Sequence, residues 1–343
     1  MLDPVKIETT PSQDPPLVSF ILFAYRQEEF VREAIEGAFA QTYRPLEILL
    51  SDDHSPDATY AIMEEMARKY SGPHRVLLNR NEANLGIGGH INRAVELTSG
   101  ELIVASAGDD VSLPERAAKL AAAWLSSGRT AHALHSAERR ITADGRDLGE
   151  QSPSVAMIEN PSTYNLIVNT LHPKGATVAW SRTVFENFGP MNDNIVSEDM
   201  VIPFRASLIG DIQYVPEALI FRRIGGISDL SNTNVIDELF GSGVVWMKRW
   251  IDCYRQYVID LGIQDTDQTS LLICLCRERI RQLELTISIA EANHFDRVRL
   301  ARLILTSPST NHRWKLVTVL KYLLPGLYRV IYDVRKNLGY SNE

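Results

Sequence analysis

Two adjacent carboxylates, Asp109 and Asp110, end an apolar run and are the strongest candidates for chemistry in this sequence. The run Leu102–Ala107 is rich in strand-forming residues, which predicts a buried β-strand just before the pair. Open α/β sheets bind ligands at the carboxyl ends of their strands. Carboxylates bind hard cations such as Mg²⁺ or Mn²⁺, and these cations hold phosphates. The alternative is a simple helix start, because a proline-containing segment follows at 113–116.

A second group of polar side chains follows the first two predicted strands. Tyr25 comes directly after a strand at 17–24, and Asp53 comes shortly after a strand at 46–50. Because parallel strands point their carboxyl ends the same way, these side chains should share a sheet edge with Asp109 and Asp110. A nucleobase suits such a crevice, since a tyrosine ring offers a stacking face and a carboxylate accepts a hydrogen bond from a base N–H. For Asp53 alone, the alternative is a turn residue.

The order of the expected elements favours an α/β fold in the first two thirds of the chain. Strand and helix patterns alternate from residue 17 to about residue 107, which predicts a mostly parallel sheet with helices on both faces. Further strands are expected at 131–136, 177–180, 212–215 and 219–222. Later segments have a helical pattern, at 239–261, 269–292, 295–305 and 314–337. We therefore expect a disordered lead-in over 1–16, an α/β domain over 17–230 and an all-helical region over 231–343.

Composition and charge limit the class of protein. The 343 residues are 45% hydrophobic and 23% charged, as in ordinary globular chains, and the formal net charge of -8 argues against a nucleic-acid partner. The first 16 residues lack the apolar stretch of a signal peptide, and no uncharged run is long enough to span a bilayer. This predicts a cytoplasmic protein. His132, His135 and His172 have no metal-ligand spacing and are expected to be structural.

Motifs between residues 18 and 228 resemble those of family 2 glycosyltransferases in type, order and spacing. They are Val18–Tyr25, Gln41–Ile48, Ser51–Asp57, Asn84–Gly86, Ser99–Glu101, Asp109-Asp110, Glu198-Asp199 and Phe221–Ser228. The resemblance implies a GT-A fold, which is a mixed, mostly parallel sheet flanked by helices, here with a C-terminal all-helical extension. It also implies an enzyme that moves a sugar from a nucleotide-diphosphate sugar to a hydroxyl group of a saccharide or lipid-linked acceptor.

The same resemblance implies roles for single residues. Asp199 matches the general base of the family, and Asp110 matches the ligand of a catalytic Mn²⁺ or Mg²⁺. The positions expected to bind the nucleotide-sugar are Ala24, Tyr25, Asp53, Asp109, Glu198 and Arg222. A base that faces the acceptor from the side opposite the leaving group gives one in-line displacement, which would invert the anomeric carbon. Without the other motifs, Glu198-Asp199 would be interpreted as an acidic helix start.

The chain departs from the family pattern at three places. Ala107 stands where many relatives carry an aspartate, so metal binding depends more heavily on Asp110. Arg26 stands where relatives usually carry asparagine, and no histidine follows Arg223 to supply a third metal ligand. A non-catalytic sugar-nucleotide-binding or scaffold protein of the same fold is therefore the alternative function. A nucleotidyltransferase is less favoured, because no basic glycine-rich loop follows the first strand.

The C-terminal segment at 314–332 mixes aromatic, leucine and basic residues. This composition suits a helix on an anionic membrane surface, at the inner face of the membrane. A helix that docks on the catalytic domain or on a second subunit of a homo-oligomer is an equal alternative. A role in bacterial surface polysaccharide synthesis is expected from the resemblance alone.

Overall fold

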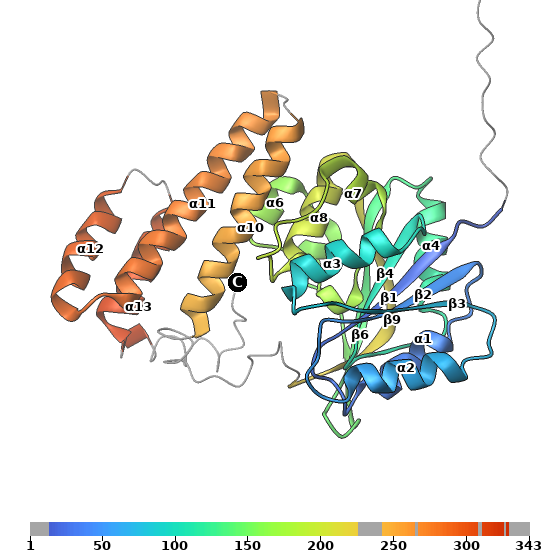
Figure 1. Cartoon of the computed structure of the whole chain (residues 1–343). Coiled ribbons are helices and arrows are strands. Elements are labelled where there is room, and N and C mark those ends of the chain that lie inside the picture. The colour runs from blue at the N-terminus through green and yellow to red at the C-terminus, as the bar shows by residue number, and fades with distance from the viewer. Residues whose placement is uncertain (1–13, 226–241, 265–266, 308–310, 326, 329–343) are drawn as a thin grey trace, which may run out of the picture.

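The computed structural model describes residues 14–225, 242–264, 267–307, 311–325 and 327–328. Figure 1 shows a helix-covered sheet in the first two thirds of the chain and a group of long helices beside it. Most of the predicted lead-in, residues 1–13, lies outside the described residues.

One half of the sheet is parallel, as the alternating pattern predicted. Its strands are β1 (Val18–Ala24), β2 (Leu46–Asp52), β3 (Arg75–Arg80) and β4 (Leu102–Ala107), in the order β3-β2-β1-β4. The connections contain α1 (Val31–Phe39), α2 (Thr59–Lys69) and α3 (Gly86–Leu97). Every residue of β1 and β2 except Phe23 is buried, which explains their continuous apolar runs. The carboxyl ends of β1, β2 and β4 therefore meet at one edge.

The other half of the sheet mixes parallel and antiparallel pairs. It continues from β4 through β8 (Ala179–Ser181), β6 (Ala131–Ile141) and β9 (Asp211–Arg223) to β5 (Val111–Ser112), and β7 (Asp147–Gln151) pairs with β6. β6 and β9 are parallel, whereas β8 is antiparallel to both of its neighbours. The two strands predicted at 212–215 and 219–222 are one strand, β9, which keeps its pairing with β6 through register shifts.

Several further helices lie between the strands, and the sequence analysis considered only the first and the last of them, as alternatives. They are α4 (Arg116–Ser126), α5 (Val155–Glu159), α6 (Thr163–Val168), the 3₁₀ helix η1 (Gly175–Thr177), α7 (Thr183–Phe188) and α8 (Glu198–Ile209). Asp109 and Asp110 lie in the turn between β4 and β5, so the helix-start alternative is wrong for this pair. Glu198 and Asp199 do open α8, so that alternative is correct for the local structure.

The C-terminal region is helical, as predicted, and consists of α10 (Ser242–Gln264), α11 (Asp267–Glu291), α12 (His294–Thr306) and α13 (His312–Leu323). The last helix was predicted to reach residue 337, but α13 ends at Leu323, and residues 329–337 lie outside the described part of the chain. None of the described helices is long and apolar enough to cross a bilayer.

The helical region shares a core with the α/β domain. One apolar cluster runs from Ile21 of β1 through Phe204 of α8 to Tyr257 of α10. Beside it, Arg205 of α8 donates to both carboxylate oxygens of Asp260 of α10, at 2.9 and 3.0 Å, and both side chains are fully buried. Removing one partner of such a pair costs about 3–5 kcal/mol. The helix that begins at Glu198 is therefore held in place by α10.

Candidate active site

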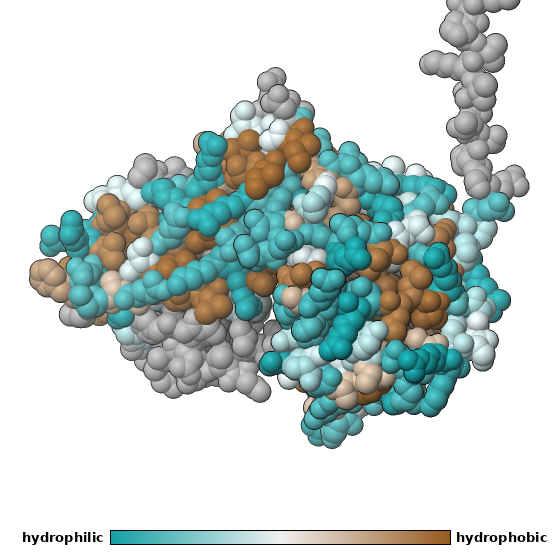
Figure 2. Space-filling view, in the orientation of Figure 1, coloured by the Kyte–Doolittle hydropathy of each residue, from teal (hydrophilic) through white to brown (hydrophobic). Residues whose placement is uncertain are grey.

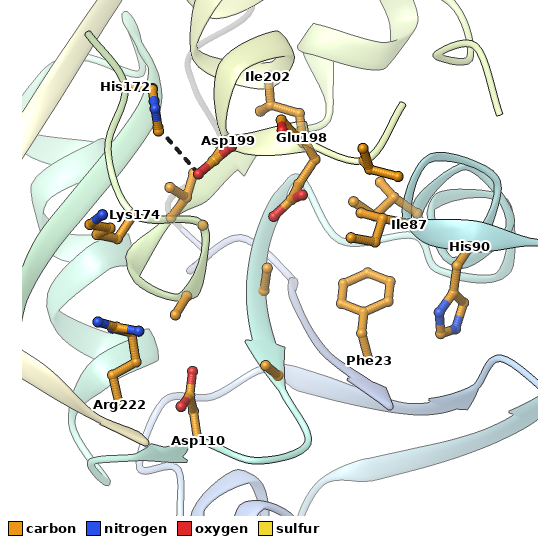
Figure 3. Close-up of a pocket in the computed structure, with 18 of the residues that line it drawn as sticks. Phe23, Ile87, His90, Asp110, His172, Lys174, Glu198, Asp199, Ile202 and Arg222 are labelled. Atoms are coloured by element: carbon orange, nitrogen blue, oxygen red, sulfur yellow. Dashed lines mark ion pairs between the residues drawn. The ribbon is translucent and has the colours of Figure 1, made fainter. Parts of the chain in front are cut away.

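A cavity of about 760 Å³ opens where β1 and β4 end, and it is closed by α8 and by the first turns of α10. This volume is in the range of small-molecule sites. Its wall includes Asp109, Asp110, Glu198, Asp199 and Arg222. Five of the predicted site residues, from three distant segments of the chain, thus face one cavity. Figure 3 shows four of them, Asp110, Glu198, Asp199 and Arg222.

The first acidic pair forms one side of the cavity. Asp110 Oδ1 accepts a hydrogen bond from the backbone N–H of Arg223, at 2.8 Å. Burial, reinforced by the neighbouring Asp109, raises the pKa of Asp110 to about 8. Burial likewise raises the pKa of Asp109. Two buried carboxyl groups side by side lack sufficient positive charge to ionise together, and a bound cation would supply it.

The residues present fit a cation shared with a phosphate better than one held by protein alone. In the part of the chain that the structure describes, no group of three or more His, Cys, Asp or Glu side chains could hold a metal ion. Mg²⁺ sites often use one or two carboxylates and complete the shell with water and substrate phosphate oxygens. Asp110 and Asp109 offer this smaller set of ligands. A small set is expected, because Ala107 stands where many relatives carry an aspartate.

The second acidic pair lies across the cavity, at the first turn of α8. Oδ2 of Asp199 is 3.2 Å from Nδ1 of His172, and Figure 3 shows this contact. Burial alone would lower the pKa of His172, but the Asp199 carboxylate outweighs it and the net pKa is raised. His172 also lines the cavity, and a role beyond the structural one expected for it is a proposal. No spacing in the sequence signalled it.

Glu198 lies beside Asp199 in the first turn of α8. Burial and the charge of Asp199 raise the pKa of Glu198 to about 8. Glu198 therefore carries a proton at neutral pH and can donate a hydrogen bond to a ligand oxygen. Gly175 of η1 packs against it so closely that a Cβ there would lie 2.5 Å from Glu198 Oε1.

Among the described residues, four arginines and lysines line the cavity, and two of them, Arg222 and Lys174, lie between the acidic pairs. Arg222, at the end of β9, donates from Nε to Glu138 Oε2 at 2.7 Å, and Lys174 precedes η1. Figure 3 shows both side chains between Asp110 and Asp199. An anionic group that spanned the cavity from Asp110 toward Asp199 would pass beside them.

Three predicted residues, Ala24, Tyr25 and Asp53, are not part of the cavity wall. They lie at the same sheet edge, where the N–H of Asp53 donates to the carbonyl of Ala24 at 2.9 Å. The Asp53 carboxylate accepts hydrogen bonds from Asn81 Nδ2 and from the N–H groups of Leu85 and Gly86, at 2.8–3.0 Å. In the structure Asp53 thus orders the loop before α3, and its role in binding a base stays a prediction.

The arrangement of the sheet and helices is that of a GT-A type domain. Solved structures support this class: S. aureus TarS 1-349 in complex with UDP-GlcNAc superimposes with a TM-score of 0.55 at 18% identity, over 88% of this chain and 79% of that one. The mannosyltransferase PcManGT of Pyrobaculum calidifontis, in complex with GDP-Man and Mn²⁺, gives 0.51 at 14% identity, over 91% and 88%. The predicted GT-A fold class is confirmed.

Sequence comparison finds similarity to glycosyltransferases. Residues 19–185 match the family model "Glycosyl transferase family 2", which covers the first half of the α/β domain and part of the second. An uncharacterized glycosyltransferase of Haemophilus influenzae is 27% identical over 62% of this chain and 66% of its own length. The chondroitin synthase of Escherichia coli is 27% identical over 61% and 29%. The chain spans less than two thirds of these curated relatives, whose names support the predicted enzyme class, glycosyltransferase.

Proposed function

We propose that this chain transfers a sugar from a nucleotide-diphosphate sugar to a hydroxyl group of a saccharide or lipid-linked acceptor, with help from a divalent cation. The observation that carries the proposal is the single cavity with Asp109-Asp110 on one side and Glu198-Asp199 on the other. The neighbours bound to UDP-GlcNAc and to GDP-Man with Mn²⁺ support it.

The donor diphosphate would lie along the side of Asp110. Asp110 and Asp109 would hold Mn²⁺ or Mg²⁺, which when bound neutralises charge on the leaving diphosphate. Arg222 and Lys174 would pair with the remaining phosphate oxygens. The base would extend toward Tyr25 and Asp53 at the same sheet edge.

The acceptor hydroxyl would approach from the side of Asp199. Asp199 takes the hydroxyl proton as the new C–O bond forms and the bond from the sugar carbon to the diphosphate oxygen breaks. One displacement of this kind inverts the anomeric carbon. Protonated Glu198 would donate a hydrogen bond to a sugar hydroxyl, and His172 would hold one Asp199 oxygen so that the other faces the acceptor.

The helical region would place the enzyme on an anionic membrane at its cytoplasmic face, where lipid-linked acceptors reside. Large apolar side chains are exposed on α11, α12 and α13, including Leu271 (64%), Phe295 (85%) and Leu316 (65%). Figure 2 shows brown patches over this part of the molecule. An exposed apolar surface of this kind marks an interaction site. An enzyme held at this membrane would act in the assembly of a bacterial surface polysaccharide. The alternative is that the same apolar surface pairs with a second copy of the chain.

Nucleotide release from a panel of UDP- and GDP-sugars, with and without Mn²⁺, tests the proposed activity. We expect Mn²⁺-dependent release of one nucleotide, reduced about 100-fold or more in Asp110→Ala and in Asp199→Asn. Asp144→Asn, on the exposed turn between β6 and β7, serves as a matched control and should keep the wild-type rate. A chain that binds nucleotide but never turns over with any donor would instead be the non-catalytic binding protein.

A further inference from the structure

The first turns of α10 contribute two tryptophans to the cavity that the proposed reaction does not use. Trp246 and Trp250 both line it, and both are half-buried. The guanidinium carbon of Arg249 lies over the Trp246 ring, 4.8 Å from its centroid. Packing of α10 does not require two indoles on the wall of a cavity that also holds acidic side chains.

The helix positions connect these tryptophans to the predicted base. Trp246, Trp250, Cys253 and Tyr257 follow one another at spacings of four, three and four, so they share one face of α10. On that face Cys253 Sγ lies 3.7 Å from the carbonyl oxygen of Ser197, the residue before Glu198. With a rise of 1.5 Å per residue, Trp250 lies about 4.5 Å and Trp246 about 10.5 Å further along the axis. The indoles thus extend away from the first turn of α8.

This placement lies on the acceptor side of the reaction. In-line displacement requires the acceptor to enter beside Asp199, opposite the diphosphate at Asp110. Resting on the proposed function, we infer that Trp246 and Trp250 form a subsite that binds the sugar rings of the acceptor. The C–H face of a pyranose packs on the negative face of an indole, and its hydroxyls remain free to bond with polar groups such as Glu198.

The chemistry of the cavity favours a sugar ring over a lipid tail as the group bound here. The wall of the same cavity carries His172, Glu198 and Asp199, which can all bond with hydroxyl groups. An alkyl chain would bury these groups without partners, and this costs free energy. The acceptor is therefore recognised by its terminal sugars, whether or not a lipid is attached behind them.

Methyl glycosides of glucose, galactose, mannose and N-acetylglucosamine test the inference with the full chain, Mn²⁺ and the donor that it hydrolyses. We expect at least one glycoside to stimulate nucleotide release and to yield a disaccharide product. In Trp250→Ala and Trp246→Ala, kcat/KM for that glycoside should fall about tenfold or more, and the ratio of transfer to hydrolysis should fall with it. Trp250→Phe keeps a ring face and should lose less than about threefold.

Lys248→Ala is the matched control, because Lys248 is exposed on α10 and pairs with Glu291. The inference is overturned if no glycoside stimulates the wild type, or if transfer and hydrolysis fall equally in both alanine variants. Failure of the wild type to hydrolyse any donor would contradict the proposed function instead. In that case saturation-transfer NMR of the same glycosides decides the subsite: signals lost in both alanine variants support it, and signals unchanged in them overturn it.

Discussion

Nδ1 of His172 and Oδ2 of Asp199 lie 3.2 Å apart on the wall of the cavity, although the two residues come from separate segments. The contact occupies one oxygen of the carboxylate and leaves the other for a ligand. A carboxylate held in this way presents its free oxygen in a fixed direction. This pair is the feature of the site that most resembles an oriented base.

Replacing His172 tests this orientation. We expect His172→Ala to lower kcat about tenfold or more with a smaller change in donor KM, because a freely rotating Asp199 faces the acceptor less often. His172→Gln supplies an amide donor and should recover part of the rate. His132→Gln, which changes a histidine bonded to Ser181 outside the cavity wall, is the control. Equal rates for His172→Ala and the wild type would remove His172 from the mechanism.

Gly175→Ala tests the position of Glu198. The added Cβ would lie 2.5 Å from Glu198 Oε1 and 3.5 Å from Asp199 Cβ, so the glutamate must move. We expect at least about a tenfold loss of kcat/KM with a folded protein. Gly262→Ala in α10 is the matched control, since nothing lies within 4 Å of its Cβ. Full activity in Gly175→Ala would show that kcat/KM does not depend on the position of the Glu198 side chain.

The raised pKa of Glu198 predicts a pH dependence of stability. Its pKa is about 8 in the folded chain and near 4.5 when unfolded, so between these values only the folded state holds the proton. The free energy of unfolding contributed by this group therefore falls as pH rises from about 5 to 8. In EDTA, we expect Tm of the wild type to fall relative to that of Glu198→Gln by about 2 °C or more over this range. Parallel Tm curves would contradict the assignment.

Much of the fold could be predicted from local patterns. β1, β2 and β4 are mostly buried runs that end in polar motifs, and the parallel order follows from the alternation of strands with helices. Pro216 interrupts the strand pattern, and for this reason β9 was wrongly predicted as two strands. In the structure, register shifts against β6 let the pairing continue past Pro216.

The candidate site could be predicted only in part. Asp110 was predicted from its place at the end of an apolar run, and Asp199 was predicted from the resemblance to family 2 glycosyltransferases. His172 lies in an irregular segment without periodicity, and only tertiary packing brings it to Asp199. The helix that carries Trp246 and Trp250 was expected, but its sequence could not indicate which face meets α8.

The exposed apolar side chains of the C-terminal helices predict binding to anionic liposomes. Co-sedimentation should be lost on truncation at Asn311 and strongly reduced in the double variant Leu316→Glu and Val317→Glu, whose side chains are 65% and 42% exposed. The double variant controls for loss of packing on truncation. If the truncated chain and the double variant both sediment like the wild type, the membrane proposal is wrong. If the wild type instead forms a concentration-dependent dimer that the double variant does not form, the surface binds a second copy of the chain.

A crystal structure of the chain with Mn²⁺ and the nucleotide that it releases tests the central claim most directly. We expect the cation at Asp110 with the diphosphate beside Arg222, and an open volume between the diphosphate and Asp199 large enough for a sugar. A nucleotide bound outside this cavity, or a diphosphate remote from Asp110, would contradict the account.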